Sequence, residues 1–503
     1  MPERVTVDSP AADPAASPAE IAPEGRPFGT ATEPAELDTS GPSAAGRAVL
    51  AELAATLDPD RMLTDPDVVR TYVHDEAEWA GYGTPLCVVR ARSTDDVAAT
   101  VRACAAHGVP VVPRGAGTGL SGGANAVAGG VVICLERMRT IREISPGERL
   151  AVVEPGVVND DLRAACAERG LWYPPDPASA PWSTIGGNVA TNAGGLCCVK
   201  YGVTRDYVLA LEVVTATGEV VRVGRRTAKG VVGLDLAGLM VGSEGTLGVI
   251  TEVTVKLRPA RPVAPRTVVG FFGSLADCGA AVAAVTERGL QPAIFELVDR
   301  ECLQAVNTWK QAGLPEDAAV LLLAQTDLPE PAAEAEADAI LAAFTEHGAT
   351  EAMSSTDPVE SEALFGARRL AYPALEQLGM DMLTEDVCVP RGRMAEMLAR
   401  VEEIAAARGV RIATVAHAGD GNLHPLMLTP RGDEAAKERT RAAFDEIIAA
   451  AVAMGGTVTG EHGVGLLKRD GMVRELGPEV VGLQRAVKAA LDPQGIMNPG
   501  KAV

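Results

Sequence analysis

This 503-residue sequence lacks the features that mark membrane-spanning and exported proteins. It has no run of about eighteen apolar residues, the length that a helix needs to cross a bilayer. No basic segment followed by an apolar one stands at the N-terminus, so we recognise no export signal. The nine cysteines show no CxxC spacing, and we expect them to be reduced core residues, as in a cytosolic protein.

Positive charge is also scarce, because 45 Lys and Arg residues face 67 Asp and Glu residues, for a formal net charge of −22. Such a chain repels the phosphate backbone of nucleic acids, and no basic stripe with interleaved aromatic residues offsets this. We therefore expect no nucleic-acid partner and no transmembrane segment. The expected location is the cytoplasm, and peripheral attachment to the inner face of the membrane through a partner subunit is left open.

What the sequence does contain is the balance of a folded globular protein, with 47% apolar and 22% charged residues. Its length predicts two or three domains. Residues 1–43, rich in Pro, Ala, Asp and Glu, are predicted to be a disordered acidic tail. We divide the rest into three parts: residues 44–260, residues 261–455, and a C-terminal segment, residues 456–503, with a helix from about Pro478 to Leu491.

Apolar runs and turn signals predict a mixed α+β fold. Ser93 or Thr94 is expected to cap a helix, and Thr217-Gly218 to form a hairpin turn. The strands expected in the first of these parts include residues 131–135, 150–154, 209–215, 220–223 and 249–257. In the second part, apolar strands alternate with alanine-rich helices, which predicts an antiparallel sheet with helices on one face.

A glycine-rich loop, PRGAGTGLSGG, follows the apolar strand at residues 109–112. Its five glycines let successive backbone N–H groups converge on an anion, and a diphosphate is the natural ligand. Alone, such a loop could also be a flexible turn. The candidate binding residues are Pro113, Arg114, Gly115, Ala116, Gly117, Thr118, Gly119, Leu120, Ser121 and Gly122.

Three glycines of this loop, Gly117, Gly119 and Gly122, also fit the G-x-G-x-x-G pattern of nicotinamide-dinucleotide enzymes. That pattern should open a helix, whereas here more glycine follows and the chain returns to a strand. The sequence therefore favours a loop that binds a diphosphate in a fold other than that of the nicotinamide-dinucleotide enzymes.

Two more small-residue clusters follow, in STIGGNVATNAGG and MVGSEGTLGVI. Small residues would let a backbone lie against a flat ring. Each cluster alone could be a turn, but three in one domain are hard to explain as turns. The candidate binding residues here are Gly186, Gly187, Asn188, Thr191, Asn192, Gly194, Gly195, Glu244, Gly245, Gly248 and Ile250.

Histidine is rare, with six in the chain, and three of them lie in two glycine-rich segments. VAHAGDGNLHPLML places His417 and His424 in an expected hairpin, and GEHGVG supplies Glu461 and His462. Two imidazoles and one carboxylate with an open position are the ligand set of a catalytic zinc or similar divalent ion. A structural histidine pair is the alternative.

The glycine clusters resemble the FAD-binding domain of the vanillyl-alcohol oxidase and p-cresol methylhydroxylase family, over roughly Gly83 to Pro259. The resemblance implies an α+β, PCMH-type FAD domain. In it the first loop holds the FAD diphosphate, and the other two contact the rest of the cofactor. Some members attach the flavin through a histidine, but none of these clusters contains one, so noncovalent FAD is implied.

The strings HAGDGNLHP, GEHGVG and NPGK resemble the C-terminal domain of FAD-linked 2-hydroxy acid oxidoreductases. That group holds bacterial glycolate oxidase flavin subunits, D-lactate dehydrogenases and D-2-hydroxyglutarate dehydrogenases. The resemblance implies a ferredoxin-like α+β cap domain and a C-terminal helical segment that returns to the flavin. The roles it implies are metal ligation by His417, His424 and Glu461, proton removal by His462, and packing beside the flavin by Asn498 and Lys501. Arg368 is the expected binder of the substrate carboxylate, because it matches the family's arginine better than Arg369, which is the alternative one residue on.

The resemblance implies oxidation of a 2-hydroxy acid, with hydride transfer to flavin N5, a metal-polarised hydroxyl, and a divalent metal that we expect to be zinc. Hydroxyglutarate dehydrogenases carry Thr, Lys and Asn where this chain has Tyr372, Thr384 and Leu426. A short D-2-hydroxy monocarboxylate, D-lactate or glycolate, is therefore the expected substrate. The electron acceptor, a quinone, an iron–sulfur subunit or an electron-transfer protein, is left open, as is a homodimer.

Three alternatives remain open on the sequence. A longer 2-hydroxy acid such as D-2-hydroxyglutarate could be the substrate. A noncatalytic FAD subunit would keep the glycine loops but would not need the histidines. A metal-dependent hydrolase would use the histidines and leave the glycine loops unexplained.

Overall fold

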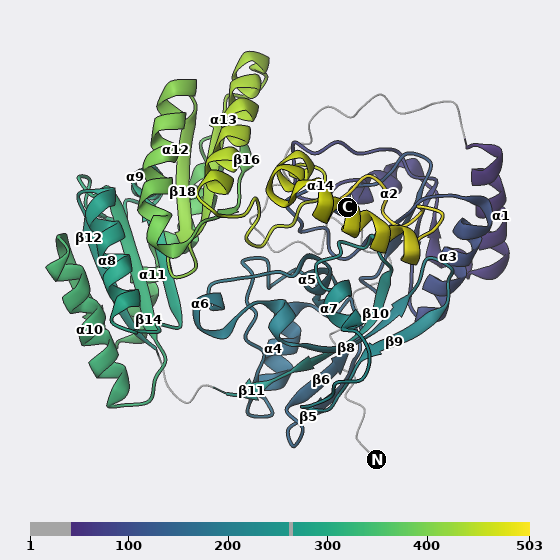
Figure 1. Cartoon of the computed structure of the whole chain (residues 1–503), viewed down its shortest axis with the longest axis horizontal. Helices are drawn as coiled ribbons and strands as arrows, with labels where there is room; N and C mark the ends of the chain where they lie inside the picture. The colour runs from purple at the N-terminus through teal and green to yellow at the C-terminus, as the bar shows by residue number, and fades with distance from the viewer. Residues whose placement is uncertain (1–41, 261–264) are drawn as a thin grey trace.

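The computed structural model describes residues 42–260 and 265–503. The predicted disordered tail falls almost entirely on residues 1–41, which lie outside the described residues. Figure 1 shows two bodies side by side: residues 42–260 form the first domain, and residues 265–453 form the second. The C-terminal segment lies over the first domain (Figure 1).

The first domain contains a small sheet of order β1-β2-β4-β3, in which β2 and β3 run parallel to β4. Ser93 caps the helix behind it by accepting a hydrogen bond from the Asp96 backbone N–H. Its elements are α1 (Ala44–Thr56), β1 (Met62–Leu63), α2 (Pro66–Val69), β2 (Cys87–Arg90), α3 (Thr94–His107), β3 (Val111–Arg114) and β4 (Val131–Cys134).

The domain also contains a fully antiparallel sheet of order β5-β6-β10-β8-β9 and a two-stranded antiparallel sheet of β11 and β7. The expected hairpin joins β8 to β9, and Gly218 takes φ +77° in its turn. The elements are β5 (Ile141–Ser145), β6 (Leu150–Val153), α4 (Asn159–Ala167), β7 (Leu171–Trp172), α5 (Ile185–Thr191), α6 (Cys198–Tyr201), β8 (Val208–Val214), β9 (Val220–Gly224), α7 (Leu236–Met240), β10 (Val249–Lys256) and β11 (Arg258–Pro259).

The second domain is built on one antiparallel sheet of order β15-β12-β14-β13-β18-β19-β16, with β17 paired to β19. The strands are β12 (Arg266–Phe272), β13 (Ile294–Asp299), β14 (Val320–Thr326), β15 (Ala349–Ser355), β16 (Asp381–Thr384), β17 (Val387–Cys388), β18 (Arg411–His417) and β19 (Asn422–Thr429). The helices are α8 (Leu275–Glu287), α9 (Arg300–Lys310), α10 (Ala332–Glu346), α11 (Pro358–Glu376), α12 (Met394–Arg408) and α13 (Glu434–Ala453).

The expectation of helices on one face of this sheet is wrong. Helices α8, α10, α12 and α13 bury one face, whose side chains include Phe295 and Leu297. Helices α9 and α11 bury the other, which carries Ile294 and Val298. Strands β12, β13, β14, β18 and β19 are therefore buried on both faces. Helix α6 of the first domain also contacts β13.

The C-terminal segment continues with α14 (Arg469–Leu491), which is broken at Gly477 by a φ of +74°. The portion after the break begins at Pro478 and matches the expected helix. The chain then returns to the first domain, where Met497 forms a bridge with Val111 of β3. This return, residues 496–501, is called the C-terminal clasp below.

The cysteines are all free, and seven of the nine are buried. Burial raises the pKa of several of their thiols, for example that of Cys87 to about 12. Within residues 42–260 and 265–503, no helix has both the length and the apolar character needed to cross a membrane.

Candidate active site

The three glycine clusters line one pocket, together with Tyr372 from α11 and Glu461 and His462 from the C-terminal segment. It encloses about 1560 Å³, part of it open to solvent. The predicted cofactor residues that line it are Pro113, Arg114, Gly115, Ala116, Gly117, Thr118, Gly119, Leu120, Ser121, Gly186, Gly187, Asn188, Thr191, Gly194, Glu244, Gly245, Gly248 and Ile250.

Four predicted cofactor residues do not line the pocket, and their cofactor contacts stay predictions. Gly122 and Gly195 belong to the same loops. The Asn192 side chain accepts a hydrogen bond from the Arg205 backbone N–H at the end of α5. The Asn498 amide donates to the backbone oxygens of Gly123 and Glu244, so it ties the first loop to the third.

The small residues of the three clusters leave a large pocket that fits a cofactor of the size of FAD, and two of the glycines also lie close to charged side chains. Gly117 has φ +76°, and a Cβ there would lie 2.0 Å from the Arg114 guanidinium. A Cβ on Gly194 would lie 2.4 Å from Glu461 Oε2. A side chain at either position would require Arg114 or Glu461 to move, so the second loop packs directly against the histidine cluster.

The hairpin predicted for His417 and His424 is present as β18 and β19. His417 pairs with Asn422 across the two strands, and His424 pairs with Val415. Their rings lie 5.2 Å apart, edge to face. Both Nε2 atoms lie 3.2 Å from Glu461 Oε1, so the structure brings the three predicted metal ligands together.

Glu296 of β13 is a member of this cluster that the sequence analysis missed. It is fully buried, and its Oε1 lies 2.6 Å from His417 Nδ1. Its Oε2 accepts a hydrogen bond of 2.8 Å from Nε of Arg368, which lies on α11. The predicted carboxylate anchor is thus joined to the predicted metal ligand through one carboxylate.

Asp386, also missed, braces the turn that carries Glu461 and His462. Its Oδ2 accepts hydrogen bonds from the backbone N–H groups of both residues and from the Thr459 hydroxyl. Its Oδ1 accepts one from the Asn422 side chain in the hairpin. A single buried carboxylate therefore fixes this turn against the two histidine strands.

The other side of the turn is fixed by the first domain. The Glu244 carboxylate accepts hydrogen bonds from the backbone N–H groups of Val464 and Gly465, each of 2.8 Å. Ser121 Oγ donates to the His462 backbone oxygen. Burial raises the pKa of Glu244 to about 7, against the pull of these N–H groups. Glu244 thus serves at least partly to hold the turn against the glycine loops.

His462 stacks on His424, with ring centroids 5.0 Å apart. Its Nδ1 is buried and has no hydrogen-bond partner among the described residues. Burial lowers the pKa of His462 to about 4, although Asp386 raises it. The imidazole is therefore neutral near neutral pH and can accept a proton, as a general base must.

The donor set of the cluster fits a divalent metal ion. Burial disfavours the charged form of His417, but Glu296 and Glu461 outweigh it and hold its pKa well above the usual value. Burial likewise disfavours ionisation of Glu461, but His417 and His424 hold its pKa well below the usual range. The site therefore favours a positive charge between these groups, and a metal ion could replace the proton there.

Asp386, His424, Glu461 and His462 form a second, overlapping group with the spacing of metal ligands. The hydrogen bonds already made to both Asp386 oxygens leave that carboxylate less available to a metal. The ligand set His417, His424 and Glu461 is the better fit on this ground.

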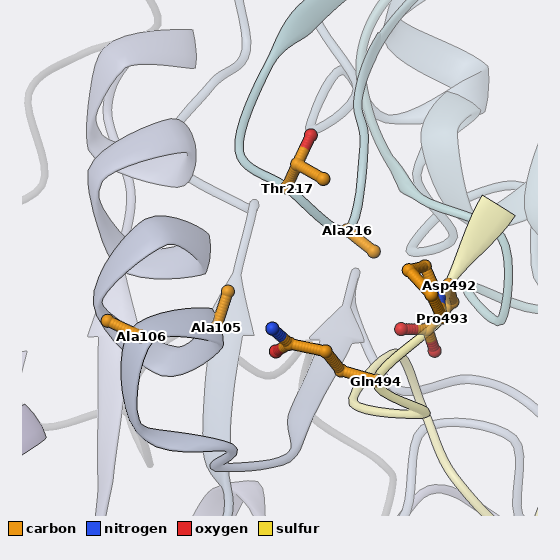
Figure 2. Close-up of a pocket in the computed structure, with 7 residues that line it drawn as sticks. All are labelled: Ala105, Ala106, Ala216, Thr217, Asp492, Pro493 and Gln494. Atoms are coloured by element: carbon orange, nitrogen blue, oxygen red, sulfur yellow. The ribbon is translucent and has the colours of Figure 1, made fainter.

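A second pocket, drawn in Figure 2, has a volume of about 520 Å³ and shares no lining residue with the first. It is lined by the end of α3, the β8–β9 turn and residues 492–494. Its one ionisable side chain, Asp492, already accepts hydrogen bonds from Ile496, Met497 and Lys488. It offers no catalytic constellation.

Comparison with known protein families matches both domains. Residues 85–224 match the FAD binding domain, and residues 261–502 match the C-terminal domain of FAD linked oxidases. The fold is also that of p-cresol methylhydroxylase (TM-score 0.74, 19% identity, 92% of this chain and 97% of that one). A 4-ethylphenol oxidase from Gulosibacter chungangensis gives a TM-score of 0.76 at 21% identity, over 92% of this chain and 98% of that one.

The fold and the site define the chain as an FAD-linked oxidoreductase, which confirms the predicted α+β fold class and enzyme class. Among its relatives, the glycolate oxidase subunit GlcD of Bacillus subtilis is 41% identical over 83% of this chain and 88% of its own length. A D-lactate dehydrogenase of Anaerostipes hadrus is 36% identical over 88% and 94%. The chain belongs to the FAD-linked oxidase family that contains these two enzymes.

Proposed function

We propose that this protein oxidises a small D-2-hydroxy monocarboxylate, glycolate or D-lactate, to the 2-oxo acid. The observation that carries the proposal is the position of His462, which lines the glycine-loop pocket and stacks on the histidine cluster. The proposed base and the proposed metal ligands therefore lie beside the glycine-loop pocket, which supports the proposal. The relatives named as glycolate oxidase subunit and D-lactate dehydrogenase support this substrate class.

Bound noncovalently, FAD would accept the hydride from C2, and a divalent ion, zinc by our proposal, would polarise the hydroxyl. The pocket residues named above would hold the FAD, and His417, His424 and Glu461 would hold the metal. His462 takes the hydroxyl proton on its neutral imidazole. Arg368 binds the substrate carboxylate through its guanidinium. Burial of the cluster keeps competing water away from these groups.

The surroundings of the site favour a short substrate. Thr384 and Leu426 are direct partners between β16 and β19, and Leu426 is buried in the core beneath α9 and α11. Tyr372 lies one helical turn beyond Arg368 and lines the pocket. None of the three positions carries a positive charge to balance a second carboxylate, and the Leu426 side chain has no hydrogen-bond donor, which supports a monocarboxylate over D-2-hydroxyglutarate.

The electron acceptor lies outside the chain in this proposal. The sequence has no CxxC spacing, and within residues 42–260 and 265–503 the cysteines form no cluster that could hold an iron–sulfur centre. The Bacillus relative is named as a subunit, and a partner subunit, a quinone or an electron-transfer protein could each take the electrons.

The test is the flavin absorbance of the purified protein, recorded without oxygen before and after adding D-lactate, glycolate or D-2-hydroxyglutarate. We expect bleaching with one of the first two, and loss of bleaching after chelation or in His462→Ala. Bleaching by D-2-hydroxyglutarate alone would refute the short substrate. Protein that carries flavin but is bleached by no hydroxy acid would favour a noncatalytic subunit. Protein that cannot bind FAD would overturn the proposal.

A further inference from the structure

Glu296 is an unusual residue for its place in the fold. It lies on β13 near the centre of the sheet and has no exposed surface. The residues two positions before and after it, Ile294 and Val298, pack into the apolar core beneath α9 and α11. A buried ion pair contributes less to stability than an apolar side chain of similar volume often would. The carboxylate therefore calls for a role other than packing.

The two oxygens of Glu296 contact two groups with different tasks in the proposed function. Glu296 is the direct cross-strand partner of His417, and its Oε1 lies 2.6 Å from Nδ1 of that ring. Its Oε2 accepts from Arg368 Nε at 2.8 Å. Each carboxylate oxygen therefore has its own partner, and both contacts are made at the same time.

The contact with His417 decides which ring nitrogen can bind a metal. A carboxylate accepts hydrogen bonds only, so Nδ1 must carry a proton. With the Nδ1 proton fixed in this way, Nε2, which faces Glu461 3.2 Å away, is the nitrogen that can give up its proton and present a lone pair to a metal. A hydrogen bond of this kind orients a metal-binding histidine and raises its basicity.

The contact with Arg368 decides how the guanidinium is presented. Because Nε donates to Glu296, the two Nη groups remain for the paired hydrogen bonds that a carboxylate accepts. The planar fork then keeps a fixed angle to the hairpin that carries His417 and His424. The anchor and the metal site are thus set at a constant separation.

We propose that Glu296 is a positioning residue that couples the metal site to the substrate anchor, by fixing the ring of His417 and the guanidinium of Arg368 with one carboxylate. The inference rests on the proposed function of this site. If Glu296 has this role, a substitution of Glu296 should change both the metal affinity of the site and the KM for the hydroxy acid.

The test variant is Glu296→Gln. The glutamine amide has one oxygen and one NH₂ group, so it cannot accept from both His417 and Arg368. If the NH₂ group faces His417, the ring must accept at Nδ1 and carry its proton on Nε2, where a metal would bind. We expect metal affinity to fall about 10- to 100-fold, and KM to rise while FAD content stays unchanged.

The measurements are metal content after dialysis, zinc affinity in competition with a chromophoric chelator, FAD content from the flavin spectrum, and KM with kcat for D-lactate and glycolate. The matched control is Glu336→Gln. Glu336 is a buried carboxylate in the same domain that accepts from Thr326 and Gln291. Its variant should keep the zinc affinity and KM of the parent protein.

Zinc affinity and KM equal to those of the parent protein in Glu296→Gln would overturn the inference. If Glu296→Gln loses FAD, the second variant Glu296→Asp tests the inference instead. The shorter carboxylate of aspartate reaches one partner only, so either the zinc affinity should fall or the KM should rise. Parental values for both quantities would overturn the coupling. Failure of the proposed metal site looks different. In that case the parent protein and His417→Ala would bind zinc equally poorly, whatever Glu296 does.

Discussion

Replacing Lys468 by methionine should destabilise the second domain, and the loss should grow as the pH rises. Lys468 is almost fully buried, and its Nζ lies 2.6 Å from Glu385 Oε1. It also donates to the backbone oxygens of Asp386 and Val458. The side chains of Glu385 and Asp386 are fully buried, so the Lys468 ammonium group is the cation that balances their negative charges.

The expected loss follows from leaving a charge buried without its partner. Breaking a buried ion pair by removing one member costs about 3–5 kcal/mol. For a unit of 150–250 residues this lowers the melting temperature by about 2–4 °C per kcal/mol, or roughly 6–20 °C in total. Methionine has a similar length and fills the space, so a cavity adds little.

The pH dependence comes from Glu385. Burial raises the pKa of its carboxyl to about 7, even though Lys468 lowers it. Without Lys468 this folded-state pKa rises further above the unfolded value of about 4.3. The folded variant then binds a proton that the unfolded chain has released, so its stability falls as the pH rises between those two values. The loss should be larger at about pH 8.5 than at about pH 6.

The assay is urea unfolding followed by circular dichroism at those two pH values, for the parent protein, Lys468→Met, Glu385→Gln and the double variant. The double variant removes both charges and should recover more than half of the loss, with much less dependence on pH. A loss under about 1 kcal/mol at both pH values would refute the reasoning. So would a double variant no more stable than Lys468→Met.

Three further predictions concern the active site and the fold. His462→Gln should lower kcat by about 10²–10⁴ with unchanged FAD content, and anaerobic flavin reduction at the parental rate would exclude His462 as the base. Arg368→Lys should raise KM for the hydroxy acid by roughly 10- to 150-fold, the loss of about 1.5–3 kcal/mol from a charged hydrogen bond; unchanged KM in steady-state assays would remove Arg368 as the anchor. Burial raises the pKa of Asp299 to about 7, so this group makes stability fall as the pH rises from about 4 to about 7. In Asp299→Asn that contribution should be absent, which melting curves across this range would detect as a flatter pH profile than that of the parent protein.

The sequence predicted those features whose signal is local. The glycine clusters can be recognised from their composition, and in the structure they line one pocket. The spacing of His417 and His424 around a small polar turn predicted the hairpin. Ser93 and Pro478 marked helix starts through capping and through the fixed φ of proline.

Features that depend on distant pairing were missed. Glu296 is 121 residues from His417 in the chain, and Asp386 is 76 residues from His462. A single acid in or before a strand gives no sign in the sequence of whether it faces water or a buried partner. The helices on both faces of the second sheet were missed for a related reason. Strands such as β14 and β19 are buried along almost their whole length, and their sequences show no regular apolar–polar alternation from which the covering of each face could be predicted.

The C-terminal clasp has a consequence for biosynthesis. Asn498 donates to the Gly123 backbone oxygen across 375 residues of chain, and Met497 bridges to β3. At about 5–20 residues per second, a ribosome needs roughly 20–75 seconds to make that intervening stretch. The first domain must therefore wait for the last part of the chain before its flavin loops are tied together. We therefore expect FAD to bind after translation of residues 496–501. A fusion partner placed directly after Val503 should slow the docking of the C-terminal clasp more than one placed before Met1.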